Sequence, residues 1–184
     1  MATHDSDDTQ AVHDADVAVT CLDTPVGQLS IAVTGTGVAS VSWGSPDAPG
    51  AHDEPTVAAH DSELAHVITQ FTEYLHGSRR HFDLAVDWRY TSGIQHAVLT
   101  TLYETVPYGT SVTYGELAAR SGHVVPARGV GAVMGSNPLP ILVPCHRVVA
   151  HDGLGGYSGG TGRNGLEIKR WLLALEGVLP PTLV

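Results

Sequence analysis

The sequence predicts an α+β protein, with a small α/β domain built on an antiparallel sheet and a mainly helical domain after it. Three observations support this prediction. Short runs rich in β-branched residues, separated by turn residues, fill positions 17–43. Apolar residues recur at helical spacing in residues 62–75 and again in 93–105. From about Tyr90 onward, short helical patterns divided by glycine and proline replace the strand-like runs.

The first domain is expected to span residues 17–88. Val17–Cys21 and Leu29–Val33 have strand character and flank the turn Thr24–Gly27, so they predict a β-hairpin. Val38–Trp43 predicts a third strand.

The rest of this domain adds a helix. After a loop rich in Pro, Gly and Asp at residues 45–55, Ser62–Leu75 predicts a helix that ends at Gly77. Phe82–Trp88 predicts one further strand. Residues 1–16 are acidic and lack apolar periodicity, so they are expected to form a disordered tail.

The second domain is expected to span residues 89–184. Gly93–Thr105 carries one apolar helical face, and Pro107 lies just beyond it. Thr113 and Glu116 have the spacing of a capping box, in which the hydroxyl and the carboxylate satisfy open amides at a helix start.

A helix-turn-helix is expected to follow this cap. The first helix runs to Ser121, Gly122 makes the turn, and Pro126–Met134 forms a second helix of small residues. Glu167–Leu175 predicts the last helix, with Gly177 after its end.

Charge is distributed unevenly along the chain. The formal net charge is −10. Residues 1–90 contain fourteen Asp or Glu and three Arg, whereas residues 91–184 contain five Asp or Glu and six Lys or Arg. The second half is therefore the half that could bind a polyanion. Because its net charge is small, individually placed side chains and helix ends would provide the binding, rather than bulk charge.

Composition also predicts the cellular setting. The two cysteines, Cys21 and Cys145, make no disulfide framework, and no apolar run reaches the roughly 18 residues of a membrane span. The N-terminus lacks the pattern of a signal peptide. We expect a cytoplasmic protein with a reduced thiol.

Cys145 is the candidate nucleophile. It lies in a Pro-Cys-His-Arg sequence, and the neighbouring His146 and Arg147 predict positive surroundings that lower the thiol pKa. A buried, inert cysteine is the alternative. Adjacent Cys and His cannot easily reach one zinc ion, and the sequence lacks the local signature of a papain-like protease.

The second helix of the helix-turn-helix is poor in long polar side chains. Its small residues allow close approach to the minor groove, although a tightly packed core helix would have the same composition. Arg128 is placed to fill the gap left by an extruded base. Tyr114, at the start of the first helix, is placed near a phosphate or serves as a half-buried structural tyrosine.

Two loops flank the candidate nucleophile. The proline-rich segment from Asn137 to Pro140 is expected to connect the second helix rigidly to Cys145. Gly153–Gly160 lacks the Gly-Lys-Ser/Thr ending of a phosphate loop, so we expect it to shape a pocket, with the ring of Tyr157 as a wall.

Five segments occur together in a recognisable order. With them the chain closely resembles the O6-alkylguanine-DNA alkyltransferases, also called methylated-DNA–protein-cysteine methyltransferases. The resemblance is close over residues 90–178 and looser over residues 17–88. The segments are Val112–Ala118, Ala127–Gly131, Ser136–Val149, Gly156–Gly160 and Lys169–Gly177.

The resemblance implies a ribonuclease H-like first domain and a winged helix-turn-helix in the second. It implies direct DNA repair, in which the alkyl group of O6-alkylguanine, and of O4-alkylthymine, moves irreversibly to Cys145 in a single turnover. It also implies double-stranded DNA as the partner, minor-groove binding, a monomer, no cofactor and no metal.

The resemblance also assigns roles to particular residues. The transfer machinery would comprise Cys145, the base His146, Glu176 that orients it, and Asn137 that fixes the turn. DNA would contact Tyr114, Arg128, Ala127, Gly131 and Ser136. The base pocket would be formed by Tyr114, Val148, Tyr157 and Ser158, with the Tyr114 hydroxyl at guanine N3, the Ser158 amide at O6, and the Cys145 and Val148 carbonyls at the exocyclic amine.

Several positions depart from the family pattern. Ser136 and Val125 replace basic residues, so weaker and more salt-sensitive DNA binding is expected. Ile94 and Leu99 replace an aromatic pair. Only Cys21 could serve a zinc site in the first domain, so none is expected.

Two other classes of protein share this kind of domain. A damage-binding relative flips the base but lacks the cysteine, and the presence of Cys145 argues against it. A methylation-sensing transcription regulator would carry additional modules, for which 184 residues leave no room.

Overall fold

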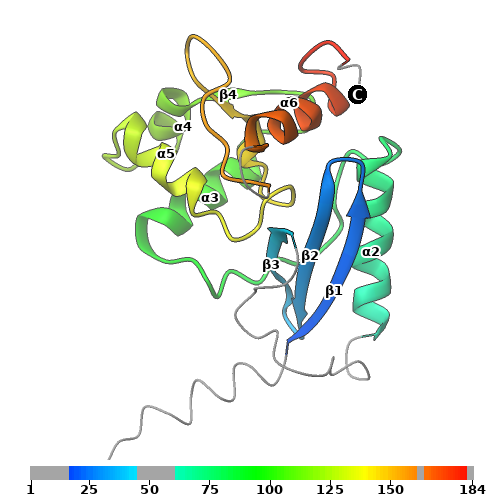
Figure 1. Cartoon of the computed structure of the whole chain (residues 1–184). Coiled ribbons are helices and arrows are strands. Elements are labelled where there is room, and N and C mark those ends of the chain that lie inside the picture. The colour runs from blue at the N-terminus through cyan, green and yellow to red at the C-terminus, as the bar shows by residue number, and fades with distance from the viewer. Residues whose placement is uncertain (1–16, 45–60, 161–163, 182–184) are drawn as a thin grey trace, which may run out of the picture.

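The structure is a computed structural model that describes residues 17–44, 61–160 and 164–181 (Figure 1). The predicted tail at residues 1–16 and the predicted loop at 45–55 lie outside the described residues. Within the described ranges no helix has both the length and the apolar character that a membrane crossing requires.

The N-terminal part is a three-stranded antiparallel sheet with one long helix against it (Figure 1). Its strands, in the order β1-β2-β3, are β1 (Ala18–Thr24), β2 (Gly27–Thr34) and β3 (Gly37–Trp43). The predicted hairpin is confirmed, because Thr24 pairs with Gly27 and Ala18 with Val33. The helix α2 (Asp61–Leu75) begins one residue before the predicted start.

The sheet and helix bury one continuous set of side chains. On β2 every residue from Leu29 to Thr34 is buried, and α2 contributes its Val67, Phe71 and Tyr74 face. Gly37 makes the tight turn into β3, with φ of +146°, and a Cβ there would come 2.3 Å from the Ala85 carbonyl oxygen. This close approach brings the chain from α2 back along β3.

The prediction of a strand at Phe82–Trp88 is wrong. Only Val86 forms a bridge, parallel to Val38 of β3, through hydrogen bonds from Val38 N to Ala85 O and from Asp87 N to Val38 O. The ladder ends because the buried carboxylate of Asp87 turns to the Thr34 hydroxyl, at 2.7 Å, and pairs with Arg89. These contacts lead the chain away from the sheet edge.

The C-terminal part is mainly helical, as predicted. Its elements in chain order are α3 (Gly93–Thr105), β4 (Val112–Thr113), α4 (Tyr114–Arg120), α5 (Ala127–Gly135), the 3₁₀ turn η1 (Cys145–Arg147), β5 (Val148–Val149) and α6 (Gly165–Leu175). The predicted bounds of α3 are confirmed, while α5 starts and ends one residue later than predicted and α6 starts two residues earlier. The α+β fold class predicted from the sequence is confirmed.

Two features of this part bring distant residues together. The helices α4 and α5 are joined by a turn at Gly122, with φ of +69°, and lie beside α3 (Figure 1). The short strand β4 pairs in parallel with β5, so Val112 lies opposite Val148. This pairing places the start of α4 directly beside the Cys145 turn.

The predicted capping box at the start of α4 is confirmed. The Thr113 hydroxyl accepts from Glu116 N at 3.2 Å, and the Glu116 carboxylate accepts from Thr113 N at 2.8 Å. Two backbone amides at this helix end are therefore satisfied by side chains.

Replacing Thr113 by alanine is expected to lower the free energy of unfolding by about 1 kcal/mol, because the helix loses its N-cap. Urea unfolding of the full chain measures the change. Thr105→Ala is the matched control, since its hydroxyl only bonds the carbonyl of Thr101 within α3. Equal effects of the two substitutions would contradict a special role of the cap.

Candidate functional site

Cys145 lies at the floor of a cavity of about 620 Å³ in the C-terminal part. Only 5% of the residue is exposed. The walls come from the start of α4, one face of α5 and the loop after β5 (Figure 1). The lining residues are Tyr114, Ala127, Arg128, Gly131, Met134, Gly135, Cys145, Gly156, Tyr157 and Ser158.

The loop between α5 and Cys145 is held by the Asn137 side chain. Its amide nitrogen donates to Val143 O at 2.9 Å, and its oxygen accepts from Leu139 N at 3.0 Å. Ile141 is the one described residue other than glycine with a positive φ, of 74°. The clamp keeps this strained loop in place, so the position of the thiol depends on it.

Burial raises the pKa of the Cys145 thiol, and the Asn137 side-chain amide and the Lys169 ammonium act in the opposite direction without cancelling it. The sequence-based expectation that His146 and Arg147 lower this pKa is therefore wrong. Burial favours the neutral thiol, and the nearest cation arrives from α6 rather than from the adjacent residues.

Arg147 points away from the thiol and anchors the turn. Its guanidinium donates to Glu176 Oε2 from Nε at 2.9 Å, to Glu176 Oε1 from Nη2 at 2.9 Å, and to Val106 O from Nη1 at 2.7 Å. The charge of Arg147 is therefore paired with a carboxylate instead of facing Cys145.

His146 and Glu176 form a fully buried pair. Nε2 of His146 lies 2.8 Å from Glu176 Oε1, and neither side chain is exposed. Because a carboxylate only accepts, Nε2 carries the proton and Nδ1 holds a free lone pair. That Nδ1 atom is buried and has no hydrogen-bond partner among the described residues.

The pKa values of this pair favour a neutral imidazole beside a charged carboxylate. Burial lowers the pKa of His146, and the bond and charge of Glu176 oppose this without reversing it. Burial raises the pKa of Glu176, but the hydrogen bonds and charges of His146 and Arg147 outweigh it and hold that pKa well below its usual range. His146 can therefore accept a proton at Nδ1.

Lys169 is a site residue that the sequence analysis did not assign. It is fully buried on α6, and its ammonium donates to Val148 O at 2.6 Å and to Gly156 O at 2.9 Å. Burial lowers its pKa to about 8, and the charge of Cys145 opposes that change. The available signal was that the single lysine of the chain follows Ile168, on the apolar face of a helix.

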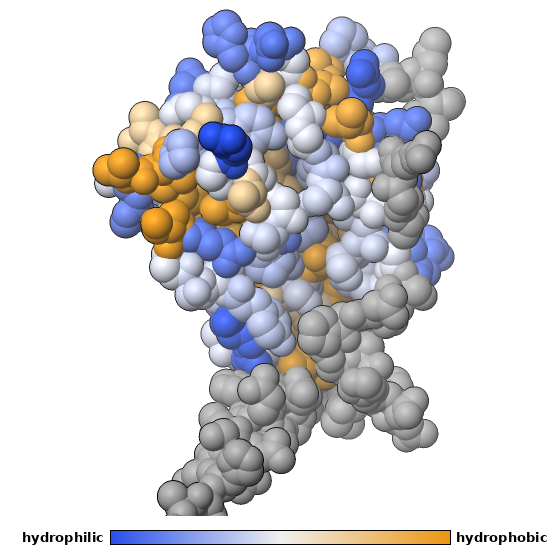
Figure 2. Space-filling view, turned by 60° about the vertical axis from the view of Figure 1, so that its left-hand side comes forward, coloured by the Kyte–Doolittle hydropathy of each residue, from blue (hydrophilic) through white to orange (hydrophobic). Residues whose placement is uncertain are grey.

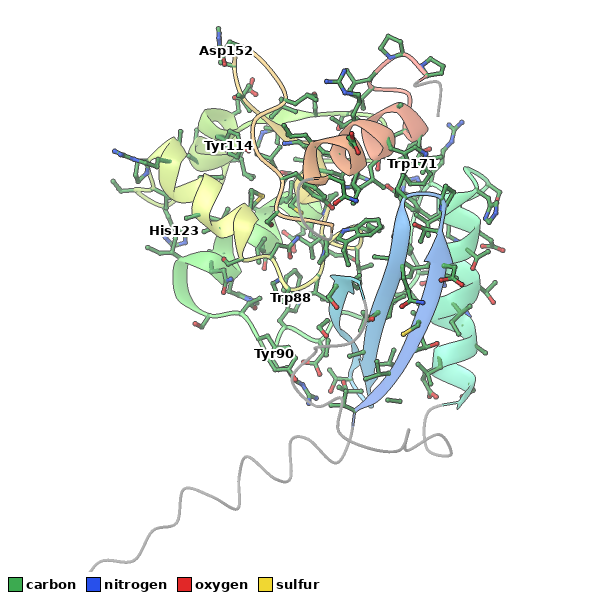
Figure 3. The ribbon with its side chains drawn as sticks, in the orientation of Figure 1. Trp88, Tyr90, Tyr114, His123, Asp152 and Trp171 are labelled. Atoms are coloured by element: carbon green, nitrogen blue, oxygen red, sulfur yellow. The ribbon has the colours of Figure 1, made fainter. Side chains whose placement is uncertain are left out.

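Tyr114 stands at the cavity mouth at the start of α4 (Figure 3). Its ring is half-buried, and its hydroxyl donates to Gly156 O at 3.4 Å. Gly155 makes room for it, because a Cβ there would come 2.7 Å from the hydroxyl oxygen. Burial raises the Tyr114 pKa, so the hydroxyl remains a proton donor at neutral pH.

The outer rim is formed by α5. Arg128 and Ala127 are exposed, and Gly131 faces the Tyr114 ring closely enough that a Cβ would lie 3.9 Å from it. Figure 2 looks onto the side of α4 and α5 and shows an apolar area there. Val124, between the two helices in the chain, is fully exposed.

The remaining predicted residues occupy different depths. Ser136 is exposed, bonded to Gln95, and does not line the cavity. Val148 is buried behind Cys145, and its carbonyl accepts from Lys169. The Tyr157 hydroxyl accepts from Trp43 Nε1 of β3 at 3.4 Å, and Ser158 binds Gly135 O.

The predicted residues therefore separate into a lining set and a supporting set. The cavity lining unites Cys145 with the predicted DNA-contacting and pocket residues except Ser136 and Val148. Asn137, His146 and Glu176 do not line it; His146 and Glu176 are buried and Asn137 is half-buried. In the part of the chain that the structure describes, no three His, Cys, Asp or Glu side chains are grouped to hold a metal ion.

Two family models match the chain. The ribonuclease-like domain of 6-O-methylguanine DNA methyltransferase matches residues 17–88, and the DNA-binding domain of the same family matches residues 93–178. The two matched segments meet close to Tyr90, where the strand-like sequence patterns give way to helical ones.

Named relatives agree with these models. A methylated-DNA–protein-cysteine methyltransferase of Mycobacterium bovis is 35% identical over 158 residues, which is 84% of this chain and 89% of the relative. The mouse protein of that name is 52% identical over 82 residues, 44% of this chain. That match spans only 37% of the mouse protein's length.

Solved structures resemble the whole fold. The O6-methylguanine methyltransferase of Mycobacterium tuberculosis has a TM-score of 0.72 at 30% identity, covering 91% of this chain and 96% of that one. M. tuberculosis OGT in complex with DNA also has a TM-score of 0.72, at 32% identity, covering 87% of this chain and 93% of that one.

Replacing Glu176 by glutamine is expected to lower the free energy of unfolding at neutral pH by about 3–5 kcal/mol, because Arg147 loses its buried counter-charge. Since folding depresses the pKa of Glu176, its stabilising effect is complete above the unfolded pKa of about 4.3 and is lost as pH falls below it. The free energy of unfolding of the variant should therefore fall less steeply with acidification than that of the wild type.

Denaturant unfolding between about pH 3 and pH 7 measures both effects. Glu167→Gln is the matched control, because this glutamate is exposed on the same helix. If the free energy of unfolding of Glu176→Gln depends on pH as that of the wild type does, this carboxylate is not the source of the acid dependence.

Proposed function

The chain belongs to the 6-O-methylguanine DNA methyltransferase family, and from this premise we propose that it is a methylated-DNA–protein-cysteine S-methyltransferase. It repairs O6-alkylguanine by moving the alkyl group to Cys145, once per molecule. The observation that carries the proposal is a buried thiol at the floor of a 620 Å³ cavity, backed by the His146–Glu176 pair.

The transfer is one displacement. The thiol loses its proton, the sulfur forms a bond to the alkyl carbon, and the bond between that carbon and O6 breaks. The electron pair of the broken bond goes to the guanine, which takes up a proton and leaves as the normal base. No cofactor enters this balance.

His146 serves as the base for the thiol proton. Its unpartnered Nδ1 supplies the lone pair, and a bridging water would carry the proton from Sγ. Glu176 holds the opposite ring nitrogen and stabilises the imidazolium that forms. This base is needed because burial keeps the Cys145 pKa raised and the resting thiol neutral.

The flipped base enters between Tyr114 and the loop at Tyr157. The Tyr114 hydroxyl would exchange its bond to Gly156 O for one to guanine N3, and the Ser158 amide would donate to O6 as charge develops there. The carbonyls of Cys145 and Val148 would accept from the exocyclic amine. Although Lys169 already donates to Val148 O, a carbonyl oxygen has a second lone pair.

DNA docks on the face of α4 and α5. A relative has been solved in complex with DNA, which supports DNA as the partner of this chain. The small residues Ala127 and Gly131 let α5 approach the minor groove, with Ser136 at its end, while Tyr114 turns the nucleotide out and Arg128 takes its place in the stack.

The remaining parts of the proposal rest on the family to which the chain belongs. Residues 17–88 and 89–184 form two domains, the protein acts as a monomer, and O4-alkylthymine is a further substrate. A free thiol that must stay reduced is consistent with a cytoplasmic setting.

Incubating the full chain with duplex DNA that contains O6-methylguanine is expected to add the mass of one methyl group to Cys145. Intact-mass spectrometry followed by peptide mapping measures the adduct. Cys145→Ala should remain unmodified, and Cys21→Ala, which removes the exposed cysteine, should still be methylated. DNA binding without any adduct would identify the protein as a damage binder instead.

Replacing Arg128 by alanine is expected to slow transfer from duplex DNA by at least about tenfold, because nothing then fills the gap in the base stack. Reaction with the free base O6-methylguanine should be unchanged, since that substrate needs no flipping. Arg120→Ala is the matched control, because Arg120 is an exposed arginine of α4 that binds Thr105 O. An unchanged duplex rate in Arg128→Ala would rule out this role.

A further inference from the structure

Tyr74 reaches the reaction centre from the other half of the molecule. It lies near the end of α2, inside the segment that matches the ribonuclease-like domain, and it is fully buried. The end of α2 lies near the end of α6 (Figure 1), and the Tyr74 hydroxyl donates to Glu176 Oε1 at 2.5 Å. The Tyr74 hydroxyl oxygen is also 3.4 Å from His146 Nε2.

The ring of Tyr74 is fixed by aromatic neighbours. Its centroid lies 5.1 Å from that of Phe82, and Tyr108 meets it edge-on at 6.0 Å. The hydroxyl is therefore aimed by packing on both sides, and its position does not depend on the bond to Glu176 alone.

Glu176 Oε1 is shared among several donors. It accepts from the Tyr74 hydroxyl, from His146 Nε2 and from Arg147, while Oε2 accepts from Arg147 and from the Gly109 amide. An oxygen that already accepts from a hydroxyl and a guanidinium carries less charge toward a third donor. The hydroxyl thus weakens the hold of the carboxylate on the imidazole proton.

We propose that Tyr74 is a positioning residue for the His146 base: its hydroxyl occupies Glu176 Oε1 and so keeps the imidazole neutral and ready to take a proton. This inference rests on the proposed alkyl transfer, since it concerns the base of that reaction. Both matched segments then contribute to the reaction centre. His146 and Glu176 lie in residues 93–178, and Tyr74 lies in residues 17–88.

Arg147 also donates to Glu176 Oε1, as a charged group, and Tyr74 adds a neutral donor to the same oxygen. Arg147 and Lys169 act on His146 by charge, and the Arg80 guanidinium lies over the Tyr108 ring. The Tyr108 hydroxyl donates to Leu175 O, not to Glu176. The charged and titratable groups that interact with the pair are Tyr74, Tyr108, Arg147 and Lys169, and Cys145 precedes His146 in the chain.

The test is Tyr74→Phe in the full chain, which removes the hydroxyl and keeps the ring. Transfer of methyl from duplex DNA is timed across about pH 5 to 9, and the rate falls on the acid side where His146 becomes protonated. Without the hydroxyl, Glu176 holds the imidazolium more strongly, so His146 keeps its proton to higher pH. We expect the acid midpoint to move upward by about half a pH unit or more.

Tyr108→Phe is the matched control and should leave the midpoint in place, since it removes a nearby hydroxyl bonded only to a backbone carbonyl. Thermal unfolding of both variants distinguishes a loss of protein stability from a change in the pKa of His146. A Tyr74→Phe midpoint that stays or moves downward, whatever happens to the maximal rate, overturns the proposal. An equal upward movement in Tyr108→Phe overturns it as well.

Titration of the His146 ring by NMR, without DNA, gives an independent measurement. The His146 signal should titrate at higher pH in Tyr74→Phe than in the wild type. If the wild type takes up no methyl group, the proposed function fails while this titration still decides the role of Tyr74. If the wild type is methylated and neither midpoint moves, only the role of Tyr74 fails.

Discussion

The carboxylate of Glu176 joins four segments that are far apart in the chain. It receives hydrogen bonds from α2 through Tyr74, from the loop after α3 through the Gly109 amide, and from η1 through His146 and Arg147. A buried charge is tolerated only when such donors replace water. Because this carboxylate needs all of these donors, it fixes the positions of α2, η1 and α6 relative to one another.

The Cys145 turn is held by polar contacts on more than one side. Asn137 clamps the loop before it, Arg147 ties its end to Val106, and Lys169 bonds both Val148 and Gly156 behind it. Each of these side chains donates to a backbone carbonyl around the turn, and for Val106 and Val148 that carbonyl belongs to a buried residue. The result is a thiol whose position is rigid while the rim at α5 remains open to a large partner.

Electrostatics at the site favour a resting state that is not reactive by itself. Burial favours the neutral thiol and the neutral imidazole, and it weakens the proton affinity of Lys169. Proton transfer from the thiol to the imidazole is therefore unfavourable at rest. This suits the proposed single-turnover reaction, because a neutral thiol is not consumed by stray electrophiles. Activation by adjacent positive residues, which the Pro-Cys-His-Arg sequence suggested, would produce the opposite behaviour.

Local signals in the sequence were sufficient for most of the secondary structure and for naming Cys145 as the candidate nucleophile. The helical spacing of Gly93–Thr105, the capping box at Thr113 and the hairpin turn before Gly27 depend on residues close in the chain, so they could be predicted. Phe82–Trp88 could not, because its strand pattern was overruled by the pairing of Asp87 with Thr34 and Arg89. The direction of Arg147, the burial of Lys169 and the contact of Tyr74 with Glu176 were decided only by the tertiary structure, since each joins residues at least 13 positions apart and no local pattern encodes which carboxylate or carbonyl a buried donor will meet.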